Sequence, residues 1–113
     1  MRQVPVLSRQ VELQERVLAA DGAGGFDQSW STLGTLWAAF DARSGRERVV
    51  GGRTISGVTY RVTVRAAPAG SPSRPHPEQR FVDGNRVYSI LAVADEDPEG
   101  LYLTCWTEEG TQE

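Results

Sequence analysis

Short runs in which apolar and polar residues alternate are the feature that most limits how this 113-residue chain can fold. The clearest run is VTYRVTVRAA at residues 58–67, where valines and a tyrosine alternate with threonines and arginines. A spacing of about two residues places the apolar side chains on one face of a β-strand. No long segment has the spacing of an amphipathic helix, so the pattern predicts an all-β protein.

Other segments are expected to form strands as well. Residues 10–18 alternate, and the turn sequence DGAGG follows them. Residues 26–40 should then form one long bent strand, or two short ones, that pair back on the first, with Gly34 at a bulge or bend. Residues 100–107 carry apolar groups on both faces, which is typical of a strand buried inside a barrel and also covered from outside.

Asp83 and Gly84 lie between two apolar runs and are a strong signal for a β-hairpin. Five or six short antiparallel strands favour a small antiparallel β-barrel of SH3 or OB-fold size, or a sandwich. The length indicates a single domain over residues 1–113. Four prolines within PAGSPSRPHP exclude regular structure from the 68–79 loop. The apolar sides of the strands predict a core of Val11, Leu13, Trp37, Tyr60, Val62, Val64, Tyr88, Ile90, Leu103 and Cys105.

The connection ARSGRERVVGGRTISG, residues 42–57, is longer than a hairpin needs, and it carries four arginines and four glycines. Ser44 and Glu47 have the spacing of a capping box, which indicates a short helix; a disordered loop is the alternative. We expect this segment to be an arm that reaches beyond the barrel during assembly, and a mobile surface loop is the competing interpretation.

The charge is unevenly distributed along the chain, although the formal net charge is only −3. Residues 95–113 hold seven acids and no base, whereas residues 1–94 have a net charge of +4. A solvated acidic tail is one interpretation of this asymmetry. The other is head-to-tail contact between copies, with the acidic end of one copy as a partner for the arm of the next.

The sequence holds one cysteine and one histidine, which excludes a disulfide within the chain and the usual four-ligand zinc site. It has no dinucleotide fingerprint, P-loop or nucleophile elbow. We interpret Cys105 as a small buried residue and His76 as a loop residue. These observations predict a protein that is not an enzyme and has no metal or cofactor. Because no apolar leader or membrane-length run is present, we also expect a soluble, non-secreted protein.

Six segments occur in a characteristic order between Arg9 and Trp106: RQVELQ, DGAGGFDQSW, LWAAFDARSGRE, YRVTVR, RFVDGNRVYSILAV and LYLTCW. The ordered set resembles the head-tail joining family of tailed bacteriophages, also called head closure or stopper proteins. It is most similar to the versions found in phage-like gene transfer agents. Many phage members are shorter where this chain has residues 68–79.

The resemblance implies a structural protein of the virion neck, made in the bacterial cytoplasm. Such proteins form a homo-oligomeric ring, expected to be twelvefold, below the portal and adaptor rings. The ring closes the DNA exit channel after packaging and docks the tail, with the tail terminator or tail tube below and packaged DNA nearby. In such a ring, the residues of the 42–57 arm expected to contact another subunit or the channel are Arg43, Ser44, Gly45, Arg46, Glu47, Arg48 and Arg53. No cofactor or membrane is implied.

The alternative is a small soluble β-barrel adaptor that binds nucleic acid or peptide. Proteins that bind single strands place aromatic side chains along a basic groove. On the 58–67 strand, Arg61 and Arg65 share their face with threonines and with no aromatic residue. The acidic final nineteen residues also disfavour a surface that follows phosphates.

Overall fold

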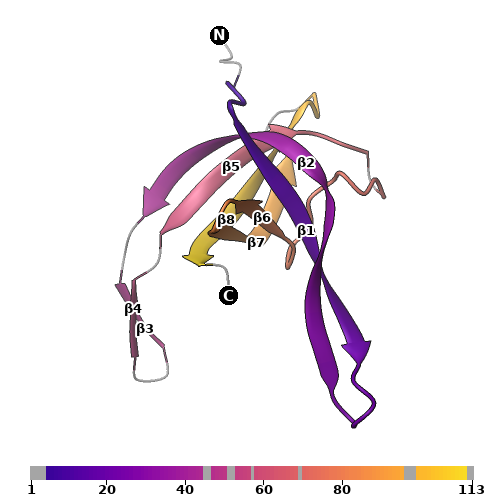
Figure 1. Ribbon diagram of the computed structural model, residues 1–113. Coiled ribbons are helices and arrows are strands. Elements are labelled where there is room, and N and C mark those ends of the chain that lie inside the picture. Colours follow the sequence, from indigo (N-terminus) through magenta and orange to yellow (C-terminus); the bar gives the residue numbers. More distant parts are fainter. Residues whose placement is uncertain are drawn as a thin grey trace.

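The computed structural model describes residues 5–44, 47–50, 53–56, 58–68, 70–95 and 99–111. The described residues form β-strands and no helix, so the all-β prediction is confirmed. Six strands close into an antiparallel barrel in the order β1-β2-β5-β8-β7-β6, and two others form a separate sheet (Figure 1). The barrel strands are β1 (Arg9–Ala20), β2 (Phe26–Ser44), β5 (Thr59–Arg65), β6 (Arg80–Asp83), β7 (Arg86–Asp95) and β8 (Tyr102–Thr111). The separate sheet consists of β3 (Glu47–Val50) and β4 (Arg53–Ser56).

The two turns predicted from sequence are present. Asp21 orders the DGAGG turn, because its Oδ1 accepts hydrogen bonds from the backbone N–H groups of Ala23 at 2.8 Å and Gly25 at 3.0 Å. In the β6–β7 hairpin, Gly84 has a φ of +64°, a conformation that a residue with a Cβ rarely adopts.

The predicted bulge in β2 is also present, beside Gly34. Leu13 of β1 pairs with Gly34, whereas the next residue, Gln14, pairs with Thr32. Leu33 is therefore the extra residue on β2. A bulge bends its strand and increases the local twist, which suits a strand that must curve around a small barrel.

The core fills the barrel with side chains from all six strands. Phe81 and Tyr88 are its largest members, and both are fully buried. The buried hydrophobic residues that pack together are Val11, Leu13, Ala38, Val62, Val64, Phe81, Tyr88, Ile90, Leu103 and Cys105. Tyr60 is partly buried and packs against this cluster.

The expectation that Trp37 belongs to the core is wrong, because its side chain is 54% exposed. Neighbouring side chains on a strand point to opposite faces, and here it is Ala38 that points inward. Ala38 pairs with Val64 of β5, so a small residue occupies this inner position while Trp37 lies on the outer surface.

The short helix expected after Ser44 is also wrong. Residues Glu47–Val50 form strand β3 and pair antiparallel with Arg53–Ser56 of β4. β-branched residues occur in both segments, and the sequence that joins them is Gly-Gly, a preferred two-residue hairpin connection. This pairing prevails over the local capping-box pattern, while the turn residues themselves lie outside the described part of the chain.

The proline-rich segment has no regular structure in its described residues, as predicted. It is nevertheless attached to the barrel. Pro75 is fully buried, the Arg74 guanidinium donates a hydrogen bond to the backbone oxygen of Ala67 at 2.9 Å, and the N–H of Ile90 donates to Gln79 O at 2.9 Å. Across the described residues, no helix has the length and apolar character needed to cross a membrane.

Candidate assembly surfaces

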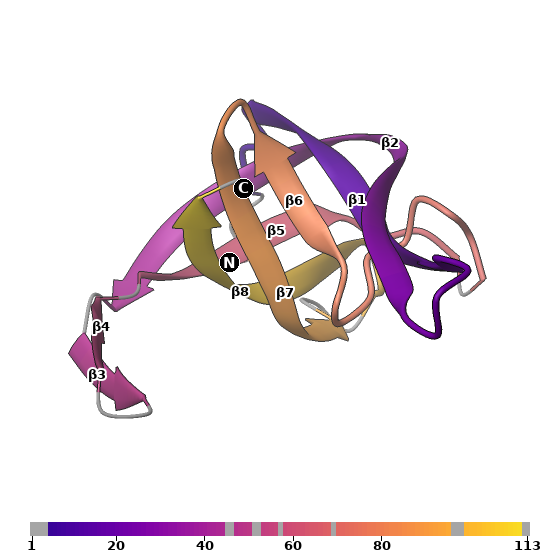
Figure 2. The same ribbon diagram turned by 60° about the horizontal axis from the view of Figure 1, so that its bottom comes forward.

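Two β-hairpins project from the barrel. Strand β2 connects them, because it begins in one hairpin at Phe26 and ends at the base of the other at Ser44. One is the distal hairpin, which we define as residues 15–31 at the far ends of β1 and β2. The other is the arm, residues 42–57, which contains β3 and β4. Figure 2 shows them on opposite sides of the barrel, and the longest dimension of the molecule is 56 Å.

The arm begins where β2 stops pairing with β5. Ala42 pairs with Tyr60 and Ser44 with Thr59, so Arg43 is an extra residue at a β-bulge. Its exposed side chain lies 3.1 Å from the carboxylate of Asp41. Among the described strands, β3 and β4 pair with each other and with no strand of the barrel.

The structure therefore places the backbone of most predicted contact residues in the projecting arm. Ser44 ends β2, Glu47 and Arg48 belong to β3, and Arg53 begins β4. Gly45 and Arg46 lie outside the described residues, as do the side chains of the other four. The expectation that these residues contact another subunit or the channel stays a prediction.

The distal hairpin was not anticipated as a projection. Residues 16–24 and 26–29 are exposed, and Gly25 between them is half-buried. Phe26 is 72% exposed and Leu18 is 56% exposed. The length of the predicted 26–40 strand was the one available signal, because it exceeds the usual strand length of about five or six residues.

Contacts at its base hold the distal hairpin against the barrel. The Arg80 guanidinium lies 3.9 Å from the ring centroid of Trp30, and its Nε donates a hydrogen bond to Gln14 at 2.8 Å. Partial burial lowers the pKa of Arg80, but the group remains a cation at any physiological pH. Beyond this base, Arg16 and Glu78 form a long ion pair of 3.7 Å.

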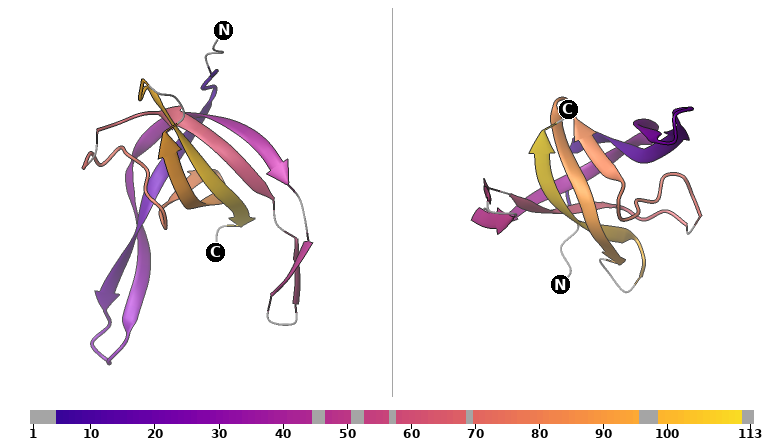
Figure 3. Two further views of the ribbon diagram at one scale, coloured as in Figure 1. Left: turned by 180° about the vertical axis from the view of Figure 1, so that it is seen from behind. Right: turned by 90° about the horizontal axis from the view of Figure 1, so that it is seen from below.

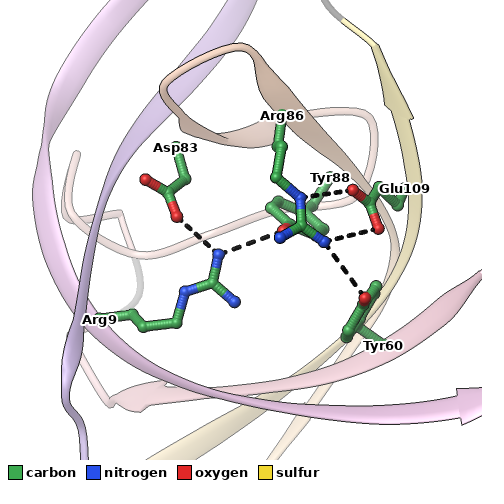
Figure 4. A network of polar contacts seen from close by, with 6 residues as sticks. All are labelled: Arg9, Tyr60, Asp83, Arg86, Tyr88 and Glu109. Carbon is green, nitrogen blue, oxygen red and sulfur yellow. Dashed lines mark hydrogen bonds and ion pairs between the residues drawn. The ribbon is translucent and has the colours of Figure 1, made fainter.

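A network of charged and aromatic residues closes the end of the barrel near the arm (Figure 4). Arg86 of β7 binds Glu109 of β8 through two hydrogen bonds, Nε to Oε2 at 2.6 Å and Nη2 to Oε1 at 3.0 Å. Arg9 of β1 donates to Asp83 at 2.6 Å and to the hydroxyl of Tyr88 at 3.2 Å. These pairs connect strands that are far apart in the sequence.

Aromatic rings lie beneath these arginines. The Arg9 guanidinium lies 4.0 Å from the ring centroid of Phe40, and the Phe40 and Tyr88 rings are 4.7 Å apart. Tyr60 contacts Tyr88 edge-to-face at 5.4 Å, and its hydroxyl oxygen accepts a hydrogen bond from Nη2 of Arg86 at 3.3 Å. Because Phe40 and Tyr60 lie just before and after the arm, this cluster fixes the two points from which the arm projects.

The pKa shifts in this network follow from its hydrogen bonds. The hydrogen bonds from Arg86 lower the pKa of Glu109, and the same bonds raise the pKa of Arg86 above its usual range. Partial burial alone would lower the pKa of Arg9, but its bonds to Asp83 and Tyr88 outweigh that effect and the net shift is upward. All of these shifts favour the charged pairs.

The outer face of the barrel carries a second group of aromatic residues. The β5–β8 register places Trp106 opposite Arg61 and Tyr102 opposite Arg65. Residues that are directly opposite in an antiparallel pair point to the same face. The sequence of β5 alone did not reveal this, since the aromatic residues belong to the neighbouring strand.

The described residues show little that could support catalysis. Within them, no cluster of three histidine, cysteine or acidic side chains is arranged to bind a metal ion. Cys105 is fully buried, and this burial raises the pKa of its thiol to about 12, which disfavours the reactive thiolate at neutral pH. His76 is exposed in the proline-rich loop.

The described residues thus form a small closed barrel from which two hairpins project (Figure 2). The chain matches the phage head completion protein family over residues 2–110, and it belongs to that family. Among solved structures, it is similar to a chain from the virion of a native gene transfer agent (GTA) particle. The two are 45% identical with a TM-score of 0.85, and the alignment covers 96% of this chain and 100% of that chain. No curated protein matches it. The family resemblance expected from the ordered segments is thus confirmed.

Proposed function

We propose that this protein is a structural component of the virion neck that closes the head after DNA packaging. Copies assemble into a ring, expected to be twelvefold, below the portal and adaptor rings. The ring seals the DNA exit channel and offers a docking surface to the tail terminator or tail tube. Its role is structural and involves no catalytic step or cofactor.

One observation supports this proposal more than any other. The chain belongs to the head completion family and joins a closed barrel to two projecting hairpins. In the described structure, β3 and β4 of the arm pair with no barrel strand, and the distal hairpin leaves Leu18 and Phe26 exposed. An isolated two-stranded hairpin is at best marginally stable in water. Hairpins of this kind gain stability when they pack against a neighbour, as they would in a ring.

A replacement of the arm tests the proposal. Residues 46–53 are exchanged for a short Gly-Ser turn, and the variant replaces the wild-type chain in cells that make particles. The barrel should fold normally, because β3 and β4 pair with no barrel strand in the described structure. DNA-filled, tailed particles should be lost, and DNA should leak from tail-less heads.

Pro72→Ser, an exposed change in the proline-rich loop, is the matched control and should leave particle yield unchanged. A normal yield of infectious or transducing particles from the arm variant would contradict the role of the arm. If deletion of the whole gene left tailed, DNA-filled particles intact, the neck function itself would be wrong.

The register of β5 and β8 supports one alternative function. Arginine and aromatic side chains share the outer face there, as they do in proteins that bind single-stranded nucleic acid. If the protein were a nucleic-acid adaptor, the pure chain would bind single-stranded DNA with a steep salt dependence. Arg65→Gln and Trp106→Ala would each weaken this binding. Salt-titrated fluorescence anisotropy distinguishes the two functions.

A further inference from the structure

We propose that the distal hairpin, residues 15–31, is the surface that receives the arm of a second copy of this chain. This inference rests on the proposed ring and names the contact that joins its subunits. The contact is head-to-tail: each copy gives its arm to one neighbour and its distal hairpin to the other. Heterologous contacts of this type close into rings when the rotation permits.

The distal hairpin presents an apolar face that no other described part of the molecule covers. Arg16 pairs with Trp30, Leu18 with Gln28, and Ala20 with Phe26. Residues paired in this way, and residues two apart on one strand, point to the same face. Leu18 and Phe26 therefore share the face of Trp30, yet both lie beyond the contact of Trp30 with Arg80 and remain more than half exposed.

Charge complementarity between the two projections identifies the arm as the occupant. The distal hairpin as a whole carries Glu15, Asp21 and Asp27 against one arginine, a net charge of −2. Glu15 and Asp27 pair with Ser31 and Ala19, so their carboxylates lie on the reverse of the apolar face. The arm carries four arginines against one glutamate, a net charge of +3. Its two strands also contain valines and an isoleucine, so the arm can supply both apolar contact and guanidinium partners.

The arrangement of the two projections suits cyclic symmetry. Both point in the same direction, on opposite sides of the barrel, in the view of Figure 1 and again from behind in Figure 3. A rotation about an axis along that direction leaves it unchanged. The arm of one copy would therefore lie alongside the distal hairpin of the next, with the two running together along the ring axis.

The acidic end of the chain is a weaker candidate for the same arm. Glu109 is already bound by two hydrogen bonds from Arg86, and Glu108 also has an interaction within the chain. By contrast, Asp27 has an exposed side chain on the reverse face of the distal hairpin. We therefore place the arm of one copy on the distal hairpin of the next rather than on its acidic end.

Cross-linking in assembled particles tests the contact. Gln28→Cys lies on the apolar face of the distal hairpin, and Thr54→Cys lies in β4 of the arm. The native Cys105 is fully buried, so a short bis-maleimide will react with the introduced thiols. The double variant should give a ladder of covalent oligomers on a denaturing gel, whereas each single variant should give monomers.

Other results would overturn the inference. Dimers from Gln28→Cys alone would show that two distal hairpins meet each other. A ladder from Gly110→Cys with Thr54→Cys, but none from the first pair, would assign the arm to the acidic end of the neighbour. If the double variant enters particles and no ladder forms, the contact is wrong while the neck function stands. If even the wild-type chain is absent from purified particles, the neck function fails as well.

A matched pair of substitutions gives an independent readout. Phe26→Ser should reduce incorporation into particles at least tenfold and leave the melting temperature of the pure protein unchanged. Leu91→Ser, an equally drastic change at a residue that is 55% exposed on the barrel, should alter neither. Equal incorporation of the Phe26→Ser and Leu91→Ser variants would contradict the proposal.

Discussion

Strands β1 and β2 form one continuous ladder, but its two halves differ in what they bury. In the barrel half, Val11 and Leu13 are almost completely buried and pair with Leu36 and Gly34. In the distal half, Leu18 and Phe26 belong to the same ladder and remain more than half exposed. Because both halves have the same backbone pairing, this pairing does not explain why the apolar side chains of one half are buried and those of the other half are exposed.

The difference separates residues that stabilise the fold from residues that are free for assembly. Burial of apolar surface gives most of the stability of a small domain, and exposed apolar side chains contribute little to it. A long hairpin that projects without burying its apolar face is costly to retain unless a partner covers it. The comparison therefore predicts that mutations in the two halves will affect different measurements.

The largest expected effect is the difference in free energy of unfolding between two phenylalanine-to-alanine substitutions, one at a buried ring and one at an exposed ring. Phe81→Ala removes a ring that is fully buried in the core. We expect it to lower the free energy of unfolding by about 3–5 kcal/mol. Phe26→Ala removes a ring that is 72% exposed and should change the free energy by less than about 0.5 kcal/mol. Urea denaturation measures both, and equal losses would refute the division between the buried core, where Phe81 pairs with Leu13 of β1, and the exposed distal half.

A smaller effect is expected at Trp37. Its side chain is 54% exposed, so Trp37→Ala should cost about 1 kcal/mol, well below the cost for a buried aromatic residue. A loss as large as that of Phe81→Ala would show that this tryptophan is in fact part of the core. The denaturation midpoint of the isolated chain is the measurement.

The sequence predicted the parts of this fold that depend on local patterns. Alternation at residues 58–67 predicted β5, Asp83-Gly84 predicted the β6–β7 hairpin, and Gly34 predicted the bulge in β2. The strand was predicted from the period of its apolar side chains, and the hairpin and the bulge from residues that allow unusual backbone conformations. Either kind of signal lies within a segment of about ten residues.

Prediction from the sequence failed where two local patterns competed, and where the outcome depended on contacts between residues far apart in the sequence. In LWAAF, apolar residues occupy both faces, so alternation could not decide whether Trp37 or Ala38 points inward. After Ser44, a capping box competed with a β-hairpin pattern, and strand pairing prevailed. Apart from the length of the predicted 26–40 strand, nothing in the local sequence indicated that the distal hairpin projects, because closure of β1 on β6 determines where the barrel ends along β1.

The ion pair between Arg86 and Glu109 should contribute less than any core residue, and its contribution should depend on pH. The hydrogen bonds from Arg86 lower the pKa of Glu109 in the folded protein. The stabilisation is therefore fully present above the ordinary pKa of a glutamate and is lost as pH falls through the lowered, folded-state value. Glu109→Gln should be less stable than wild type at pH 7, and the difference should vanish in acid. A difference that persists unchanged at pH 2 would contradict this account.

The smallest expected effect comes from the largest change. If residues 18–28 are replaced by a two-residue Asn-Gly turn between the paired residues Val17 and Ser29, the barrel loses none of its buried core residues, since all of these lie outside the deleted segment. The free energy of unfolding should therefore stay within about 0.5 kcal/mol of wild type. Urea denaturation and circular dichroism would show a folded protein that fails to enter particles. If the shortened chain instead unfolds, the distal hairpin stabilises the barrel, and the exposed face of Leu18 and Phe26 would need an explanation within the monomer.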